Sequence, residues 1–83
     1  MMSRVGITFK IYPEEGQLDS AIEGIKREMN PAALATEDIG FGIKVIKVLI
    51  KFEDTETSSS KLEERLRSIK GVNEIEVESE TLI

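Results

Sequence analysis

The sequence predicts an α+β fold in which four strands form one antiparallel sheet and two helices cover one face of it. Strand periodicity is the first indication, because apolar and polar residues alternate near both ends of the chain. Two stretches with apolar residues every three or four positions are the second indication, and they predict helices. The segments run strand, helix, strand, strand, helix, strand, which is the split βαβ arrangement called ferredoxin-like.

The first strand is predicted over residues 4–12. Every second side chain there is apolar and is expected to point to the same side of the sheet: Val5, Ile7, Phe9 and Ile11. Pro13 ends the strand because proline lacks the N–H that a sheet needs. An acidic turn follows it: Glu14, Glu15 and Gly16.

A first helix is predicted directly after this turn. Its apolar stripe has spacings of four, three and four residues: Leu18, Ile22, Ile25 and Met29. Asp19 or Ser20 is expected to cap its start, and Glu23 stands in capping-box register to Ser20. Pro31 is expected to end the helix.

Two strands joined by a tight turn are predicted in the middle of the chain. Residues 32–39 predict a short strand, and residues 43–52 predict a long central strand because they are dense in β-branched side chains. Four side chains of the central strand are expected to face the helices: Ile46, Val48, Ile50 and Phe52. Strict alternation would place Lys44 on the same side as these buried side chains, so we expect a bulge near Gly42 or an exposed strand end.

A polar segment over residues 53–60 leads into the second helix and the last strand. The helix is expected to be capped by Ser58, Ser59 or Ser60. Its apolar stripe is Leu62, Leu66 and Ile69. Gly71 is expected to end it in a left-handed cap. The last strand starts at Val72 and is expected to bury Ile75 and Val77, with glutamates on its opposite face.

Length and composition restrict the function. We expect the 83 residues to form a single domain over 1–83, with a small core. No apolar run reaches the ~18 residues that cross a bilayer, so we expect a cytoplasmic protein. Absence of cysteine and histidine excludes disulfides, thiolate nucleophiles, Cys/His metal sites and imidazole catalysis. A net charge of −5 disfavours nucleic-acid binding, which needs a basic face, and favours a basic partner.

Any catalysis would have to use carboxylates, Lys, Ser or Tyr, and the adjacent carboxylates are the first candidates for catalysis or metal binding. Glu14-Glu15 and Glu37-Asp38 lack metal-loop spacing, and both pairs are typical of solvated turns. An acylphosphatase of this topology needs an arginine after the first strand, where this chain carries glutamates. An RNA-recognition domain needs exposed aromatic residues on its central strands, where this chain has lysines and aliphatic residues. We therefore predict no catalytic residue, metal or cofactor.

The segment Gly40-Phe41-Gly42 is the most informative stretch for function. The glycines favour a tight turn over a regular strand, and a ring at a turn tip is expected to be partly exposed. Exposed aromatic side chains often carry much of an interface's binding energy. The alternative is that Phe41 folds back over its own sheet, and the sequence leaves both open.

Taken with its neighbours, this segment resembles the nucleotide-exchange domain family of translation elongation factor 1-beta, in its short archaeal form. The run Ile39-Gly40-Phe41-Gly42-Ile43-Lys44 is its most specific part. The resemblance extends over nearly the whole chain, from Val5–Pro13 with its acidic turn to Gly71-Val72 and the strand that follows. It implies a factor that promotes GDP release from the GTPase elongation factor 1-alpha, with no covalent chemistry.

The resemblance also implies partner-binding residues. The aromatic residue at Phe41 is expected to enter the GTPase near its nucleotide pocket, on a turn that Gly40 and Gly42 permit. Lys44 is expected to lie on the same contact edge. Family members carry a basic residue near the C-terminus, which this chain lacks. Either the tail acts only by packing Leu82 and Ile83, or another cation such as Lys44 contributes.

Two rival hypotheses remain at this point. A ferredoxin-like regulatory or self-assembling domain would pair its free sheet face with a second copy and bury Phe41 there. A small hydrolase would use Glu14 or Glu15 and would need phosphate or a metal beside that turn. The exchange-factor hypothesis instead expects a monomer when the partner is absent.

Overall fold

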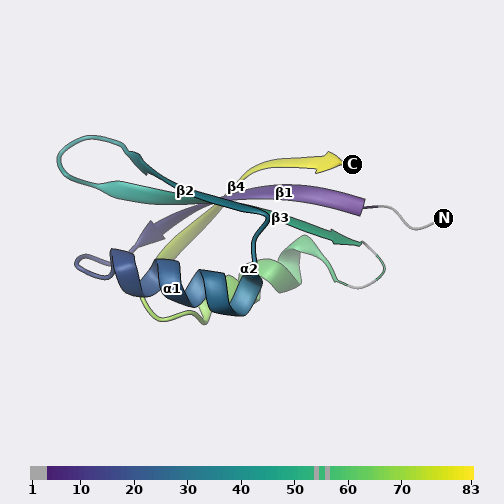
Figure 1. Cartoon of the computed structure of the whole chain (residues 1–83), viewed down its shortest axis with the longest axis horizontal. Helices are drawn as coiled ribbons and strands as arrows, with labels where there is room; N and C mark the ends of the chain where they lie inside the picture. Colours follow the sequence, from purple (N-terminus) through teal and green to yellow (C-terminus); the bar gives the residue numbers. More distant parts are fainter. Residues whose placement is uncertain (1–3, 54, 56) are drawn as a thin grey trace.

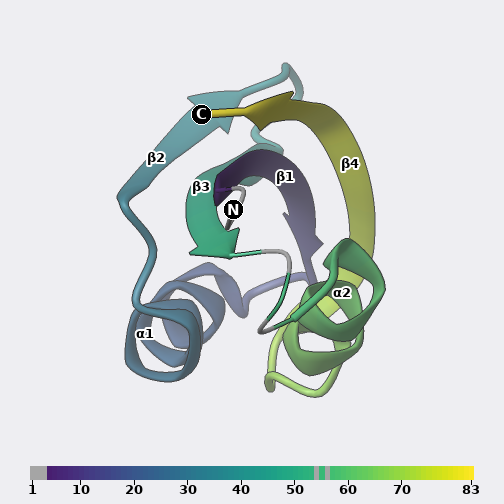
Figure 2. The same cartoon turned by 90° about the vertical axis from the view of Figure 1, so that its right-hand side faces the viewer.

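The fold is a four-stranded antiparallel sheet with two helices on one face (Figures 1 and 2). The computed structural model describes residues 4–53, 55 and 57–83, so Asp54 and Glu56 of the predicted polar segment lie outside the described residues. The elements are β1 (Arg4–Pro13), α1 (Leu18–Met29), β2 (Ala33–Asp38), β3 (Lys44–Glu53), α2 (Ser59–Arg67) and β4 (Val72–Leu82). The strand order is β2-β3-β1-β4, and the ferredoxin-like prediction is confirmed.

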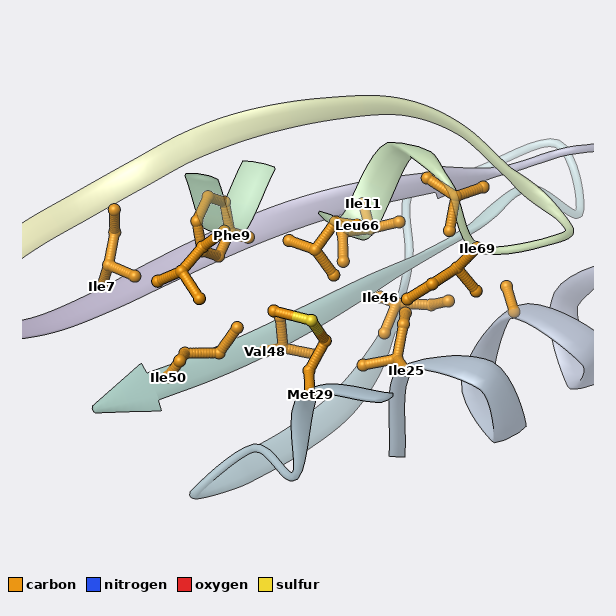
Figure 3. Packing of buried hydrophobic residues seen from close by; sticks show 13 residues of the cluster. Ile7, Phe9, Ile11, Ile25, Met29, Ile46, Val48, Ile50, Leu66 and Ile69 are labelled. Carbon is orange, nitrogen blue, oxygen red and sulfur yellow. The ribbon is translucent and has the colours of Figure 1, made fainter. Parts of the chain in front are cut away.

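The core lies between the helices and the two central strands (Figure 3). The helix-facing side chains of β1 and β3 are buried as their alternation predicts: Ile7, Phe9, Ile11, Ile46, Val48 and Ile50. Both helices add the buried part of their apolar stripes: Ile25, Met29, Leu62 and Leu66. Leu18 and Ile22, the apolar stripe residues in the first half of α1, are only partly buried against this cluster. Phe52 is also partly buried. The sheet therefore has one sealed face and one free face.

Helix α1 closely contacts the segment after α2 at Gly24, a position that periodicity did not single out. A Cβ atom on Gly24 would lie 2.5 Å from Cγ2 of Ile69, so any larger side chain would force Ile69 or α1 to shift. Ile69 belongs to the predicted stripe and is buried, although it lies just beyond the end of α2. The packing of Ile69 against α1 thus depends on the absence of a side chain at Gly24.

The predicted start of α1 is wrong. The helix begins at Leu18, its cap position is Gln17, and no side chain caps it. Asp19 and Ser20 lie inside the first turn because the preceding turn, closed by a 2.9 Å bond from Gln17 N–H to the Glu14 carbonyl, leads directly into the helix. Asp19 still favours this end, since a carboxylate stabilises the positive end of the helix dipole.

The ends of α2 give one confirmed and one wrong prediction. Ser58 caps the start, with its hydroxyl oxygen accepting from Lys61 N–H at 3.4 Å. The helix ends at Arg67, and Ser68 at the C-cap keeps a right-handed backbone. Gly71 has the predicted positive φ of 94°, but it lies in the turn before β4, where its carbonyl accepts from Glu14 N–H.

The predicted burial of Val77 is also wrong. β4 is an edge strand, and Val77 is 42% exposed while Ile75 is partly buried. The pairing with β1 shifts between Thr8 and Phe9, which leaves Glu78 as an extra residue on β4. An edge strand receives less cover from the helices than the two central strands, so alternation alone overstates its burial.

Candidate partner-binding site

The β2–β3 hairpin ends in a tip made by residues 39–43, called the hairpin tip below. Ile39 N–H donates to the Ile43 carbonyl at 2.9 Å, and Ile43 N–H donates to the Gly40 carbonyl at 3.0 Å. Phe41 and Gly42 have φ values of 56° and 76°, as the two central residues of a type I′ turn require. The predicted glycine-flanked turn is therefore present.

Phe41 projects entirely into solvent. Its relative exposure is 104%, so the alternative in which the ring folds back over its own sheet is wrong. A left-handed backbone costs a residue with a Cβ atom about 1–2 kcal/mol, and Phe41 is one of only two such residues in the described chain. The ring therefore adds nothing to the core while its backbone is strained, a combination that is typical of functional positions.

The tip exposes more apolar surface than this one ring. Ile39 and Ile43 flank Phe41 and are also among the exposed large hydrophobic residues. Lys44 follows as the first residue of β3, paired with Asp38 in an unbroken register. β2 and β3 pair without a bulge, and Lys44 is exposed at the end of its strand. It therefore avoids the burial that strict alternation would give it. An apolar tip with a cation at its base is the result.

A groove lies between the hairpin and the turn after β1. It has a volume of about 740 Å³, and its lining comes from two segments and the start of α1: Pro13, Glu14, Glu15, Gly16, Leu18, Phe41, Gly42, Ile43 and Lys44. Glu14 is anchored through its N–H to the Gly71 carbonyl at 2.7 Å. The sequence predicts the acidic turn and the tip separately, and the fold brings them together across this groove.

The tail residues lie at the other end of the sheet. Leu82 pairs with Val5, which pairs with Phe52 near the end of β3, whereas the hairpin tip precedes the start of β3 (Figure 1). Because β3 has ten residues, the two ends are about 30 Å apart. Lys44 therefore does not lie beside the C-terminus, and the predicted partner-binding residues fall into two separate groups.

The tail is attached to its own sheet. Ile83 N–H donates to the Arg4 carbonyl at 2.9 Å. The Ile83 side chain lies over Gly6 on the free face, where a Cβ atom would be 2.8 Å from Cδ1 of Ile83. Leu82 and Ile83 nevertheless remain 74% and 63% exposed. This end thus combines a structural contact with exposed apolar surface.

A lysine bridges the middle of the free face. Nζ of Lys47 on β3 lies 2.9 Å from Glu37 Oε2 on β2 and 3.0 Å from Glu78 Oε1 on β4. The hydrogen bond from Lys47 lowers the pKa of Glu37, and the hydrogen bonds to Glu37 and Glu78 raise the pKa of Lys47. The network connects both edge strands across β1.

Within residues 4–53, 55 and 57–83, no three acidic side chains are grouped so that they could hold a metal ion. In the same residues, no helix has the length and apolar character needed to cross a membrane. The free face also carries a hydrogen bond from the Tyr12 hydroxyl to Glu76 Oε2 at 3.3 Å, with Lys10 over the Tyr12 ring.

An exposed aromatic tip with a cation at its base is typical of a protein-binding domain, because exposed aromatic side chains often carry much of an interface's binding energy. Residues 6–83 match the family described as the EF-1 guanine nucleotide exchange domain. The chain belongs to this family, so its function is guanine nucleotide exchange in translation elongation rather than covalent catalysis. The family implies the GTPase elongation factor 1-alpha as its partner.

Similarity to relatives extends along almost the whole chain. The protein is 36% identical to elongation factor 1-beta of Aeropyrum pernix, over 94% of both chains. It is 38% identical to that of Hyperthermus butylicus, over 94% of this chain and 92% of the relative. Identity to the Thermoplasma volcanium factor is 32%, over 99% and 100% of the two chains. The resemblance predicted from the Gly-Phe-Gly segment is confirmed.

Proposed function

We propose that the hairpin tip is the part of this exchange factor that enters elongation factor 1-alpha, with Phe41 as the wedge. The observation that carries the proposal is a fully exposed ring on a left-handed backbone. The ring adds no buried surface to the domain, and its left-handed backbone lowers stability, so we assign the ring a role in binding. Gly40 and Gly42 allow the turn that presents the ring.

The wedge accelerates release through differential affinity. A factor that binds the nucleotide-free GTPase more tightly than the GDP form lowers GDP affinity by the same ratio, because coupling between two ligands is reciprocal. Full burial of a phenyl ring contributes about 1.5–3 kcal/mol. If the pocket for Phe41 opens only when nucleotide contacts relax, this energy corresponds to roughly ten- to a hundredfold in the coupling.

Lys44 is proposed as an electrostatic contact at the base of the tip. It is exposed and shares the groove with the acidic turn of Glu14 and Glu15. A partner surface that binds Phe41 would also contact this cation and the two carboxylates. Charge pairs at such a rim mainly guide association and orientation, so we assign the affinity to the ring.

Leu82 and Ile83 are proposed as a second contact at the far end of the sheet. Both are exposed, and the longest dimension of the molecule is 45 Å, so one partner surface would have to be long to touch both ends. The tail of this chain has no Lys or Arg. We therefore propose that it acts through apolar packing, with the ring at the tip as the larger contribution.

The remaining predictions fit the same role. We propose that residues 1–83 act as one exchange domain, in the cytoplasm, as a monomer when the partner is absent, and on protein rather than nucleic acid. The self-assembly rival needs Phe41 inside a face-to-face contact, whereas Phe41 is on the hairpin tip and the free face carries the Lys47 ion network. Sedimentation of the free protein separates these hypotheses.

The test is release of fluorescent GDP from elongation factor 1-alpha. We expect Phe41→Ala to lower the stimulated rate roughly ten- to a hundredfold and to leave the melting temperature unchanged or higher. The matched control is Val77→Ala, which removes another exposed apolar side chain away from the tip. A folded Phe41→Ala protein with wild-type exchange would remove the wedge from the mechanism.

A further inference from the structure

The hairpin tip carries an unusual number of left-handed residues for its length. Gly40, Phe41 and Gly42 have φ values of 102°, 56° and 76° in succession. Packing does not hold them there, because no atom lies within 4 Å of a Cβ built on either glycine, and the ring of Phe41 is fully exposed. The tip must therefore be fixed by hydrogen bonds.

One of these bonds comes from a side chain. Oδ1 of Asp38, the last residue of β2, accepts from Gly40 N–H at 2.9 Å. An aspartate that bonds to the N–H two residues later forms an Asx turn, which replaces one backbone turn by a side chain. The other bonds of the tip join backbone groups within residues 39–43. Asp38 thus connects the end of the regular strand to the first left-handed residue.

We propose that Asp38 is a positioning residue for nucleotide exchange, acting by holding the tip in the conformation that presents Phe41. This inference rests on the proposed function of Phe41 as the wedge. If only a fraction of the free factor has the competent tip, its apparent affinity for the GTPase falls by that fraction. Loss of one such hydrogen bond changes the competent population roughly two- to tenfold.

The positioning role predicts a distinct kinetic signature. Once bound, the tip is held by the partner, so the maximal exchange rate stays near that of the wild type. The KM for the GDP-bound GTPase rises instead. Phe41→Ala has the opposite signature, because it removes the group that lowers GDP affinity and therefore reduces the maximal rate. The two roles are separated by which kinetic constant changes.

Asp38 also offers a way to separate geometry from charge. Asp38→Asn keeps a side-chain oxygen in the accepting position and removes the negative charge, whereas Asp38→Ala removes both. If Asp38 acts through its hydrogen bond, asparagine restores the KM. If Asp38 acts through its charge, asparagine does not restore it. The matched control is Glu74→Ala, which removes an exposed carboxylate from β4, the opposite edge strand, where Glu74 pairs with Tyr12.

The experiment measures GDP release from elongation factor 1-alpha over a range of GTPase concentrations, together with hydrogen exchange of the Gly40 amide in the free proteins. We expect Asp38→Ala to raise KM roughly two- to tenfold and to speed exchange of the Gly40 amide by a similar factor. Asp38→Asn is expected to recover most of both values. Glu74→Ala is expected to match the wild type in both.

Three results would overturn the proposal. An unchanged KM in Asp38→Ala would show that the tip needs no such restraint. Failure of Asp38→Asn to recover KM would assign the effect to charge. Wild-type exchange by Phe41→Ala would remove the proposed function itself, and Asp38 would then be a structural cap only, a case identified by faster Gly40 amide exchange with no kinetic effect.

Discussion

The two ends of the sheet expose apolar side chains in different ways. At the hairpin tip, the Phe41 ring contacts none of its own domain's core, and its backbone has a positive φ. At the tail, Ile83 is also exposed, but its N–H bonds to Arg4 and its side chain covers Gly6. One end exposes a ring at a cost in stability, and the other exposes residues that also support the fold.

This difference indicates which substitutions separate stability from function. At the tip, replacing Phe41 by a residue that tolerates the left-handed backbone loses no core contact and relieves strain, so exchange and stability should change in opposite directions. At the tail, removing Ile83 loses packing, so any effect on exchange is mixed with an effect on the fold. The tip is therefore the cleaner place to test the mechanism.

The largest effect is expected from Phe41→Asn. Asn-Gly is the favoured pair at the centre of a type I′ turn, and asparagine tolerates the left-handed backbone that Phe41 adopts. We expect the free energy of unfolding to rise by about 1 kcal/mol and stimulated GDP release to fall roughly ten- to a hundredfold. Denaturant melts and the fluorescent-GDP assay give the two numbers.

The matched variant for this comparison is Phe41→Tyr. It keeps an aromatic ring and the same backbone strain, so it should retain most of the exchange activity without the gain in stability. A Phe41→Asn protein that is less stable than the wild type would show that the ring supports the hairpin after all, and the contrast between the two ends would disappear.

The sequence predicted the framework of the fold because one-dimensional periodicity records which face of an element is buried. It failed where the outcome depends on neighbours distant in the chain. Val77 has the right alternation but lies on an edge strand, and Gly71 has the right φ but serves the turn before β4. The contact of Gly24 with Ile69 depends on how the segment after α2 packs on α1, which periodicity does not specify.

The candidate site was predicted in its parts but not in its arrangement. The Gly-Phe-Gly turn is a local signal, since glycines permit the backbone that the tip adopts. Its distance from Leu82 depends on the registers of three paired strands, which the sequence does not display. In the sequence, Asp38 is interpreted only as half of a carboxylate pair, although an aspartate two residues before a glycine turn is a recognisable Asx-turn signal.

A smaller effect is expected from Ile83→Ala at the tail. About a third of this residue is buried, so its loss should lower the free energy of unfolding by about 0.5–1 kcal/mol. Leu82→Ala is the matched variant, because Leu82 is more exposed and should cost less stability. Denaturant melts of both proteins check this order.

Exchange assays on the same two proteins sharpen the contrast further. If the tail is a secondary contact, both variants should reduce stimulated release less than Phe41→Ala does. A tail variant that slows exchange more than the tip variant, while remaining folded, would reverse the assignment of the main contact.

The smallest effect is expected between the two ends, from Lys47→Gln. Hydrogen bonds with Lys47 lower the pKa of Glu37 below its ordinary value of 4.5, and bonds with Glu37 and Glu78 raise the pKa of Lys47 above 10.5. A carboxylate whose pKa is lower in the folded than in the unfolded protein stabilises the fold at a pH above its unfolded-state pKa. This contribution is lost as the pH falls through the folded-state pKa. A lysine whose pKa is higher in the folded protein stabilises the fold at a pH below its unfolded-state pKa. This contribution is lost as the pH rises through the folded-state pKa.

The wild type should therefore exceed Lys47→Gln in melting temperature at about pH 7, and the difference should shrink by about pH 3 and in high salt. Lys51→Gln, on the same face of β3, controls for loss of a lysine. Because Lys47 contacts the edge strands but not the hairpin tip, exchange should stay at the wild-type rate. Slower exchange in Lys47→Gln would mean that the free face transmits strain to the tip, so the two ends could no longer be treated as independent.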